Sequence, residues 1–377
     1  MTTEPIPVLD DVARMQAVDK RYMLRLINEL PEQCETALGI ARDFAIEPPE
    51  NKPNGVFITG VGDSGLAADM AAAILADEAE VPVISDHGGR LPKHVGENSL
   101  VIVVDYTGKS QSALRNIHEA KQRGAHVICV TTGGKLLEAA SNDEIKTIKI
   151  PPGQLHRSAI GYLFVPLVVT VERLGLAEGQ IEKLSHAIKL MKNARESLRF
   201  ENPTSRNIAK QTAAALFGKL TAIYGAPGYR AAVASRWKSQ IDANSKALAF
   251  TGAFPELALG DISGWEFANN RCGEFGIVIL RDPSDKGEIA ELMDASEEVL
   301  QQFNVIRIDI RGATAMERSL YGVYMGDYVS YYLALLYEVN PSLTENVSLV
   351  EAIMIGEPEV EAIVVGEPEP DIPDEPE

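Results

Sequence analysis

Short apolar runs that alternate with helical runs constrain the fold of this chain more than any other feature. Between residues 55 and 174, strand-like runs lie at 55–59, 81–84, 99–104, 126–131 and 145–150, and helical runs lie at 64–77, 110–122, 135–141 and 155–174. This alternation predicts a parallel sheet that is covered by helices on both faces. Ligands bind such sheets beyond the carboxyl ends of the strands.

The alternation resumes after a helical stretch at 178–215. Strands are predicted at 220–224, 276–280 and 305–310, and helices at 229–244, 286–303 and 316–338. Residues 8–46 also have helical periodicity, which Pro31 is expected to interrupt. Tyrosines recur along the last long helix, and we interpret them as packing residues. The sequence therefore predicts two α/β halves behind a helical N-terminal segment.

Composition excludes several classes of function. The chain of 377 residues has a formal net charge of −19, so nucleic acid and anionic membrane surfaces are not expected as partners. The longest apolar run, 163–171, is too short to span a bilayer, and the first residues do not form a signal peptide, so we expect a cytoplasmic protein. The three cysteines have neither the spacing of a zinc site nor that of a disulfide framework, and we expect no metal.

The C-terminal tail is acidic and repetitive. Residues 351–377 contain ten acids and no base, and the segment 351–359 recurs as 361–369. Charge and proline content predict disorder beyond about residue 366. Two apolar triplets, 353–355 and 363–365, could form short edge strands or dock on a partner.

A glycine turn at Gly60–Gly65 joins the first strand to the first helix. Backbone N–H groups and the helix N-terminus at such a turn favour an anion, most often a phosphate. The turn has the spacing G-x-G-x-x-G, and Asp86 lies at the end of the next strand, which is the outline of a dinucleotide fingerprint. The glycine turn alone is compatible either with a dinucleotide or with a smaller phosphate compound as its ligand.

Two further loops and one arginine follow strands of the same predicted sheet. Asp105–Ser110 brings hydroxyl groups and a glycine to a helix N-terminus, and 131–136 repeats the pattern. A P-loop is excluded because Val103 stands where that motif needs glycine. Arg157 begins the next helical run. Donors on several sides of one cleft suit a compact phosphomonoester better than a dinucleotide.

These residues resemble the double-SIS (sugar isomerase) family, and within it the archaeal-type bifunctional phosphoglucose/phosphomannose isomerases. The resemblance covers about residues 8–352. The matching segments are Ser64-Gly65, Thr107-Gly108, Ser110, 131–136, Arg157, Arg236-Trp237-Lys238-Ser239-Gln240, Asn244-Ser245-Lys246, Pro255-Glu256-Leu257 and Gly264-Trp265. It implies two flavodoxin-like, three-layer αβα SIS domains with parallel sheets. The expected division is a helical segment 1–52, SIS domain 1 at 53–177, a helical connector 178–215, SIS domain 2 at 216–352 and a tail 353–377.

The resemblance also implies a site and an activity. The residues expected to hold a sugar phosphate are Ser64, Gly65, Thr107, Gly108 and Ser110. Arg157 is expected beside the reacting C1–C2 region, where it would stabilise an enediolate. The family interconverts glucose or mannose 6-phosphate and fructose 6-phosphate without a metal or other cofactor, and it usually works as a homodimer.

This sequence departs from the family pattern where protons are transferred. The family's glutamate base is replaced by Ala243, its histidine by Leu259, and no lysine follows Lys286. Candidate replacement groups are Asp242, Glu256 and His156. We therefore weigh an isomerase against a non-catalytic sugar-phosphate-binding or regulatory protein, and, from the glycine turn, a dinucleotide-binding oxidoreductase.

Two acids are also new in the phosphate loops. Asp63 stands where the family has glycine, and Asp105 stands where it has the first serine of the second loop. Each either repels a phosphate dianion or caps a helix N-terminus.

Overall fold

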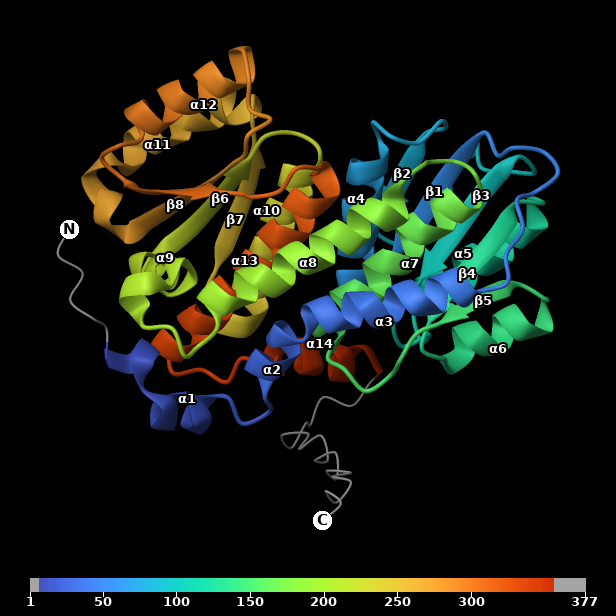
Figure 1. The fold of residues 1–377 in the computed structure, drawn as a ribbon, viewed down its shortest axis with the longest axis horizontal. Coiled ribbons are helices and arrows are strands. Elements are labelled where there is room, and N and C mark those ends of the chain that lie inside the picture. Colours follow the sequence, from blue (N-terminus) through green and yellow to red (C-terminus); the bar gives the residue numbers. More distant parts are fainter. Residues whose placement is uncertain (1–6, 356–377) are drawn as a thin grey trace. The chain divides into compact units, whose positions relative to one another are not determined.

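The first sheet has five parallel strands. The computed structural model describes residues 7–355, in which β1 (Gly55–Gly60), β2 (Val83–Asp86), β3 (Ser99–Val104), β4 (His126–Thr131) and β5 (Lys146–Lys149) pair in the order β2-β1-β3-β4-β5. Helices α4 (Asp63–Leu75), α5 (Gln111–Gln122), α6 (Gly134–Asn142) and α7 (Ile160–Arg173) connect the strands or follow them (Figure 1). The predicted α/β class is confirmed.

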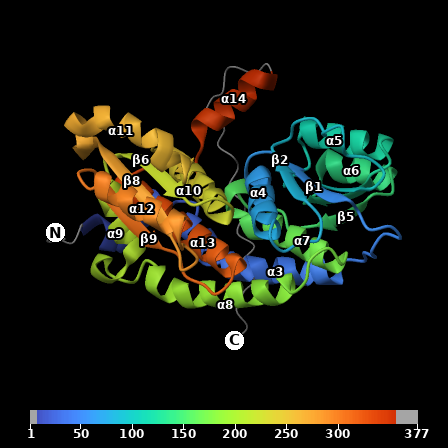
Figure 2. The ribbon, with the colours of Figure 1, turned by 90° about the horizontal axis from the view of Figure 1, so that it is seen from above.

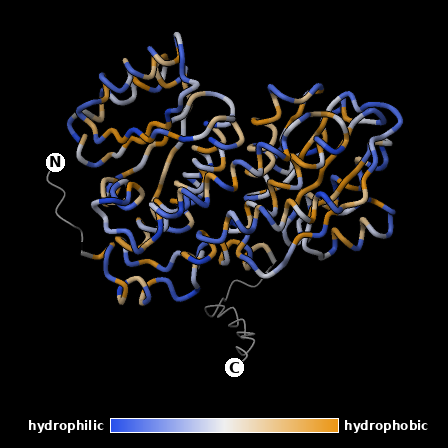
Figure 3. Tube along the Cα trace, viewed as in Figure 1, coloured by the Kyte–Doolittle hydropathy of each residue, from blue (hydrophilic) through white to orange (hydrophobic). Residues whose placement is uncertain are grey.

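Alternate side chains of these strands pack into two separate cores. Val101 and Cys129 belong to a cluster with α5 and α6, whereas Ile58 and Ile102 belong to one with α4 and α7. This period of two is the geometry of a pleated strand that is buried on both faces. Figure 3 shows the strands of the sheets as mainly hydrophobic segments. The first half is therefore a three-layer αβα arrangement.

The second sheet has four parallel strands. They are β6 (Leu220–Gly225), β7 (Ala249–Ala253), β8 (Phe275–Arg281) and β9 (Asn304–Asp309), in the order β7-β6-β8-β9. The helices around it are α10 (Tyr229–Ser245), α11 (Ile262–Ala268), α12 (Glu288–Val299) and α13 (Ala315–Leu336). Sequence reasoning missed β7, an edge strand with Phe250 and Thr251 exposed, because it lacks a continuous apolar run. It also missed α11 and the single π-helical turn Leu257–Asp261 before it.

Helices that precede and join the two sheets complete this unit. They are α1 (Val12–Val18), α2 (Met23–Asn28), α3 (Leu30–Asp43), α8 (Gln180–Leu198) and α9 (Ile208–Leu216). Helix α8 lies beside α3 and contacts α7 and α13, so it touches helices of both halves (Figure 2). The helix breaks at Glu29, between α2 and α3, and Pro31 lies in the first turn of α3, where its missing N–H costs nothing, so the expected interruption at this proline is confirmed.

Helix α13 is the most deeply buried element of the second half. From Ser319 to Leu336 all of its residues are buried, and Tyr324, Tyr328, Tyr331 and Tyr332 are completely buried. Their rings contact one another within the core. The interpretation of these tyrosines as packing residues is therefore confirmed.

A second compact unit begins at Leu343, after the unit that contains both sheets ends at Ser342. It contains α14 (Glu345–Ile355). The apolar triplet at 353–355 lies in this helix, so an edge strand there is wrong; the triplet at 363–365 and the disorder expected beyond 366 lie outside the described residues. Among the helices described, none is both long enough and apolar enough to cross a membrane.

Candidate functional site

The three predicted loops lie at the same edge of the first sheet. Gly60 at the end of β1 pairs with Val104 at the end of β3, and Val104 pairs with Val130 of β4. The loops that follow these strands are therefore neighbours, as the strand order requires.

Backbone hydrogen bonds join the second and third loops. The N–H of Thr132 donates to the carbonyl of Tyr106 at 2.9 Å, and the N–H of Leu136 donates to that of Gly108 at 2.9 Å. Gly108 has φ +66°, and a Cβ atom at this position would lie 1.8 Å from the carbonyl oxygen of Gly133. Only glycine allows the two loops to approach this closely.

The first loop brings the hydroxyl of Ser64 to the N-terminus of α4. Ser64 is 5% exposed, and its hydroxyl makes no hydrogen bond to any part of the chain that the structure describes. A Cβ atom on Gly65 would lie 2.7 Å from Nδ1 of His87, so the segment after β2 packs directly on this turn. Ser64 therefore offers an unused donor at the sheet edge.

Asp105 occupies the donors of the second loop. Its Oδ2 accepts a hydrogen bond from the N–H of Ser110 at 2.7 Å, and the Thr107 hydroxyl lies 3.5 Å from its Oδ1. Ser110 itself caps α5, since its Oγ accepts from the N–H of Ala113 at 3.4 Å. The alternative that Asp105 caps the helix is therefore wrong. The Asp105 carboxylate instead accepts a hydrogen bond within the loop Asp105–Ser110, which the sequence predicts to bind phosphate.

Asp63 does not cap its helix either. The N-cap of α4 is Gly62, without a side-chain cap bond. The Asp63 carboxylate instead accepts a hydrogen bond from Nη1 of Arg236 at 3.2 Å, which joins α4 to α10. This acid therefore connects the first loop to the second half.

Arg236 is also held by an acid from α13. Its Nε and Nη2 bind the two carboxylate oxygens of Asp327 at 3.1 and 3.0 Å, and both side chains are buried. Burial acts to raise the pKa of Asp327, and the charge of Arg236 opposes this. Arg236 further donates to the backbone carbonyl of Arg157.

Arg157 lies between the two halves. Its Nε donates to Oδ1 of Asn244 at 2.8 Å, and its Nη2 donates to the carbonyl of Pro341 at 2.5 Å. Burial lowers the pKa of Arg157 to about 10, whereas Asp63 acts to raise it and Arg236 to lower it. The guanidinium thus keeps its charge at neutral pH. Its Nη1 has no hydrogen-bond partner within residues 7–355.

The residues at the family's proton-transfer positions are apolar, and the candidate replacements lie elsewhere. Leu259 is 75% exposed, and Ala243 is partly exposed on α10. Asp242 binds Lys238 at 2.5 Å and accepts from the N–H of Ala249 at 2.9 Å. Its carboxylate therefore fixes the start of β7.

The other two replacement candidates are exposed. The side chain of Glu256 makes no hydrogen bond or ion pair within the described part of the chain. His156 lies against the ring of Tyr106, with 5.5 Å between the ring centroids. Within residues 7–355, no hydrogen bond, ion pair or ring contact joins the side chain of Asp242, Glu256 or His156 to that of Arg157.

Asp86 supports its own loop. Its Oδ2 accepts from the N–H of Gly89 at 2.6 Å, and the Thr59 hydroxyl lies 3.4 Å away. The carboxylate that a dinucleotide would require for its ribose is thus bound within the turn. Within residues 7–355 no group of three His, Cys, Asp or Glu side chains could hold a metal ion.

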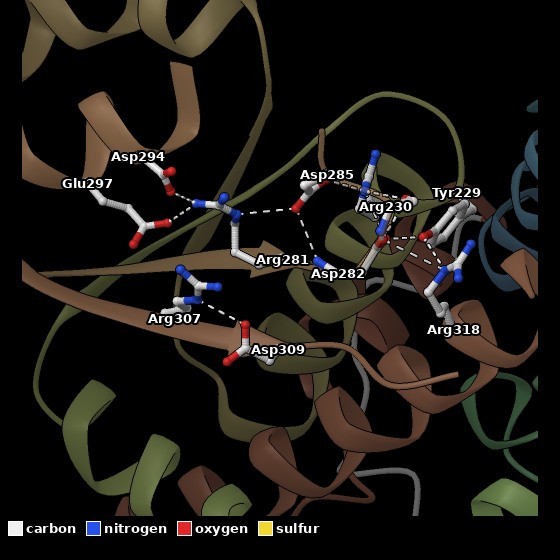
Figure 4. Close-up of polar contacts among 11 residues, drawn as sticks. Tyr229, Arg230, Arg281, Asp282, Asp285, Asp294, Glu297, Arg307, Asp309 and Arg318 are labelled. Atoms are coloured by element: carbon white, nitrogen blue, oxygen red, sulfur yellow. Dashed lines mark hydrogen bonds and ion pairs between the residues drawn. The ribbon is translucent and has the colours of Figure 1, made fainter. Parts of the chain in front are cut away.

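A second polar cluster lies at the carboxyl end of β8, close to the N-terminus of α10 (Figure 4). Asp282 binds Nη1 of Arg230 at 2.8 Å and accepts from the hydroxyl of Tyr229. Burial acts to raise the pKa of Asp282, but its hydrogen bonds and Arg230 lower it overall. Arg281 binds Asp285 at 3.2 Å in the same cluster. The sheet edge of the second half is therefore also occupied by the chain's own ion pairs.

Sequence reasoning missed Asp327 and the cluster in Figure 4. A signal for Asp327 was present, because it is the one charged residue between Arg318 and Glu338 in an otherwise apolar and aromatic segment. A buried acid of this kind requires a partner. Arg230 and Asp282 gave no such signal, since each lies next to a turn where charged residues are ordinary.

Comparison with known proteins agrees with this architecture. The profile of the SIS domain matches residues 51–168, and that of the bacterial phospho-glucose isomerase C-terminal SIS domain matches residues 205–352. A solved glucose-6-phosphate isomerase-like protein from Thermus thermophilus is similar in fold, with a TM-score of 0.60, 21% identity, and coverage of 89% of this chain and 98% of that one. A C-terminal domain of glucosamine-fructose-6-phosphate aminotransferase from Francisella tularensis has a TM-score of 0.64 at 14% identity, covering 87% and 99%.

Two curated relatives bear the same name. The bifunctional phosphoglucose/phosphomannose isomerase of Caldicellulosiruptor bescii is 34% identical over 331 residues, which cover 87% of this chain and 98% of the relative. That of Thermoplasma acidophilum is 30% identical over 298 residues, or 79% and 88% of the two chains. With two matched SIS domains and this degree of identity along the chain, the protein belongs to the bifunctional phosphoglucose/phosphomannose isomerase family of double-SIS proteins.

Proposed function

We propose that this protein binds a hexose 6-phosphate at the carboxyl edge of the first sheet and does not interconvert aldose and ketose at an ordinary enzymatic rate. One observation carries the proposal: the positions of the family's base and histidine hold Ala243 and Leu259. Neither side chain can transfer a proton. A positioned acid or base typically contributes about 10²–10⁴-fold to a rate.

Unused donors support the binding of a ligand. The Ser64 hydroxyl and Nη1 of Arg157 make no hydrogen bond within the described residues, although both side chains are buried. Neither atom is among the fully buried side-chain atoms that lack a partner in the described chain, so both remain accessible and can donate to a ligand. The proposed contacts of the sugar phosphate are Ser64, Gly65, Thr107, Gly108, Ser110 and Arg157.

The charges around Arg157 argue further against efficient isomerisation. An enediolate is an anion and is stabilised by uncompensated positive charge. Here the charge of Arg157 is opposed by Asp63, and that of Arg236 is compensated by Asp327 and Asp63. Two cations face two acids, so no net positive charge is left for the intermediate.

The second candidate is the isomerase itself. The 34% identity with the C. bescii relative, across 98% of that protein, favours this activity. It would require a relocated base, for which Asp242, Glu256 and His156 are the candidates. Of these, Asp242 is already bound to Lys238 and to the backbone of Ala249.

One assay with a parallel titration separates the candidates. Purified protein would be given fructose 6-phosphate, and formation of glucose and mannose 6-phosphates would be followed by coupled detection. The three sugar phosphates and NAD would be titrated calorimetrically. We expect heat with a sugar phosphate and no turnover. Turnover of about 1–10³ per second would establish the isomerase instead, and a response to NAD alone would revive the oxidoreductase.

We also propose that the protein forms a homodimer. We further propose that its domains are divided as the sequence predicts, with SIS domain 1 at 53–177 and SIS domain 2 at 216–352. The edge strand β7 supports the homodimer, because Leu248 just before it and Phe250 within it are 61% and 48% exposed. Exposed apolar side chains on an edge strand favour association. Sedimentation equilibrium of the wild type and of F250D would measure the oligomeric state, and an unchanged monomer mass in both would overturn it.

A further inference from the structure

We propose that Asp105 acts as an internal ligand of the phosphate loop, so that a phosphosugar binds only by displacing this carboxylate. The inference rests on the proposed function and concerns the regulation of the same site. Asp105 would then set both the affinity and the charge preference of the site.

The carboxylate has the same partners as the expected phosphate. Its Oδ2 accepts the Ser110 N–H at 2.7 Å, and its Oδ1 faces the Thr107 hydroxyl at 3.5 Å. A phosphate oxygen at this helix N-terminus would use the same N–H and hydroxyl groups. The loop therefore has its anion already, supplied by its own first residue.

The backbone of the loop is fixed, so displacement must occur by rotation of the side chain. The Asp105 N–H donates to the carbonyl of Val130 at 3.1 Å, and its carbonyl accepts from Gly108 at 3.2 Å. Leu136 and Thr132 hold the rest of the loop from the other side. Asp105 is only partly buried, so its carboxylate can turn towards solvent while the backbone donors keep their positions.

Both loss of donors and repulsion of like charges weaken phosphate binding. At about 4 Å, the interaction of two unit charges corresponds to about fivefold in affinity at the dielectric constant of water and to about a thousandfold at an effective value of 20. A phosphate dianion carries more than one unit charge, so its repulsion by the Asp105 carboxylate is larger than that of a single charge pair. Removal of the Asp105 charge should therefore strengthen binding by about tenfold or more.

Two substitutions separate the charge of Asp105 from its shape. Asp105→Asn keeps an oxygen that can accept from Ser110 and removes the charge, whereas Asp105→Ser also removes the blocking group. Asp143→Asn is the matched control, because it makes the same change of charge at the exposed C-terminus of α6, where Asp143 pairs with Lys121.

The experiment is calorimetric titration of the four full-length proteins with glucose 6-phosphate, inorganic phosphate and glucose. We expect D105N and D105S to bind both phosphate compounds at least tenfold more tightly than the wild type, with glucose affinity unchanged and D143N equal to the wild type. Circular dichroism would verify folding, and D105N decides alone if D105S does not fold.

The outcomes distinguish this inference from the proposed function. If the wild type binds glucose 6-phosphate and both Asp105 variants bind it equally well or less tightly, the internal ligand is refuted and the proposed function stands. If none of the four proteins binds a phosphate compound, the proposed function fails and this inference fails with it. Tighter phosphate binding by D143N as well would assign the effect to net charge and overturn the inference.

Discussion

Arg236 and Asp327 form a two-point ion pair in the interior, between helices α10 and α13. Both side chains are buried, and Asp63 adds a third contact from the other half of the unit. A buried pair is not strong evidence of stability, but removal of one partner leaves an uncompensated charge.

Asp327→Asn should destabilise the fold by about 3–5 kcal/mol, because Arg236 would keep its buried charge with less compensation. Asp63→Asn removes the more exposed acid and leaves the pair with Asp327 intact, so we expect a loss of about 1 kcal/mol. Urea unfolding of both variants measures these free energies. Equal losses of unfolding free energy in the two variants would show that the deeper burial of Asp327 does not make its removal more costly than that of Asp63.

Asp10 and Lys210 give a prediction for acid pH. Partial burial acts to raise the pKa of Asp10, but bonds from Lys210 and Thr204 lower it overall to below its usual 3.8. A lowered folded pKa gives stability that is present above pH 3.8 and is lost as the pH falls through the folded value. We expect Asp10→Asn to have a shallower decline of unfolding free energy below pH 3.8 than the wild type.

The same substitution tests the buried lysine at neutral pH. The ammonium of Lys210 is fully buried and binds Asp10 at 2.9 Å, and it also donates to the carbonyls of Phe200 and Asn202. Burial lowers the pKa of Lys210. D10N should cost about 1–3 kcal/mol at pH 7, since a buried charge loses its counter-ion. Chemical unfolding of D10N and the wild type at pH 7 and below pH 3.8 provides the measurement. If the unfolding free energy of D10N lay below that of the wild type by the same amount at every pH, the lowered pKa of Asp10 would be contradicted.

The three thiols should differ in reactivity. Cys34 and Cys129 are completely buried, and burial raises the pKa of both, that of Cys129 to about 12, whereas Cys272 is partly exposed. Because the thiolate is the reactive form, one thiol per native chain should react rapidly with Ellman's reagent at pH 8. Cys272→Ser should remove this reaction, and rapid labelling of a second thiol in that variant would contradict the structure.

The sequence was sufficient for the order of most strands and helices, because apolar periodicity follows directly from burial on one or both faces. Runs such as 99–104 lie within the strands that they predict. The sequence was not sufficient to predict β7. Phe250 and Thr251 of this strand are exposed, and the strand forms by pairing with β6. Edge strands depend on a partner more than on their own pattern.

The candidate site was predictable as a set of loops but not as a set of contacts. Parallel strands 55–59 and 99–104 must end at one edge, which places the loops that contain Ser64 and Ser110 at the same edge of the sheet. By contrast, the bonds from Arg157 to Asn244 and Pro341 span 87 and 184 residues. No local pattern encodes such pairs, because they arise only when the two halves pack.

Gly108 offers a test of how the loops are held together. It has φ +66°, and a Cβ there would lie 1.8 Å from the carbonyl oxygen of Gly133, a backbone atom that cannot rotate away. Gly153 also has a positive φ, +92°, but no atom lies within 4 Å of the added Cβ. The two glycines therefore share conformational strain and differ in crowding.

Gly153→Ala should cost about 1–2 kcal/mol, which is the penalty of a left-handed conformation for alanine. Gly108→Ala should cost about 1–3 kcal/mol more, since overpacking adds to the strain, and it should weaken binding of glucose 6-phosphate by separating the second loop from the third. Thermal unfolding and calorimetric titration of both variants measure the two effects. Equal destabilisation would show that crowding against Gly133 is relieved without cost, and unchanged sugar-phosphate affinity in G108A would separate this loop contact from the site.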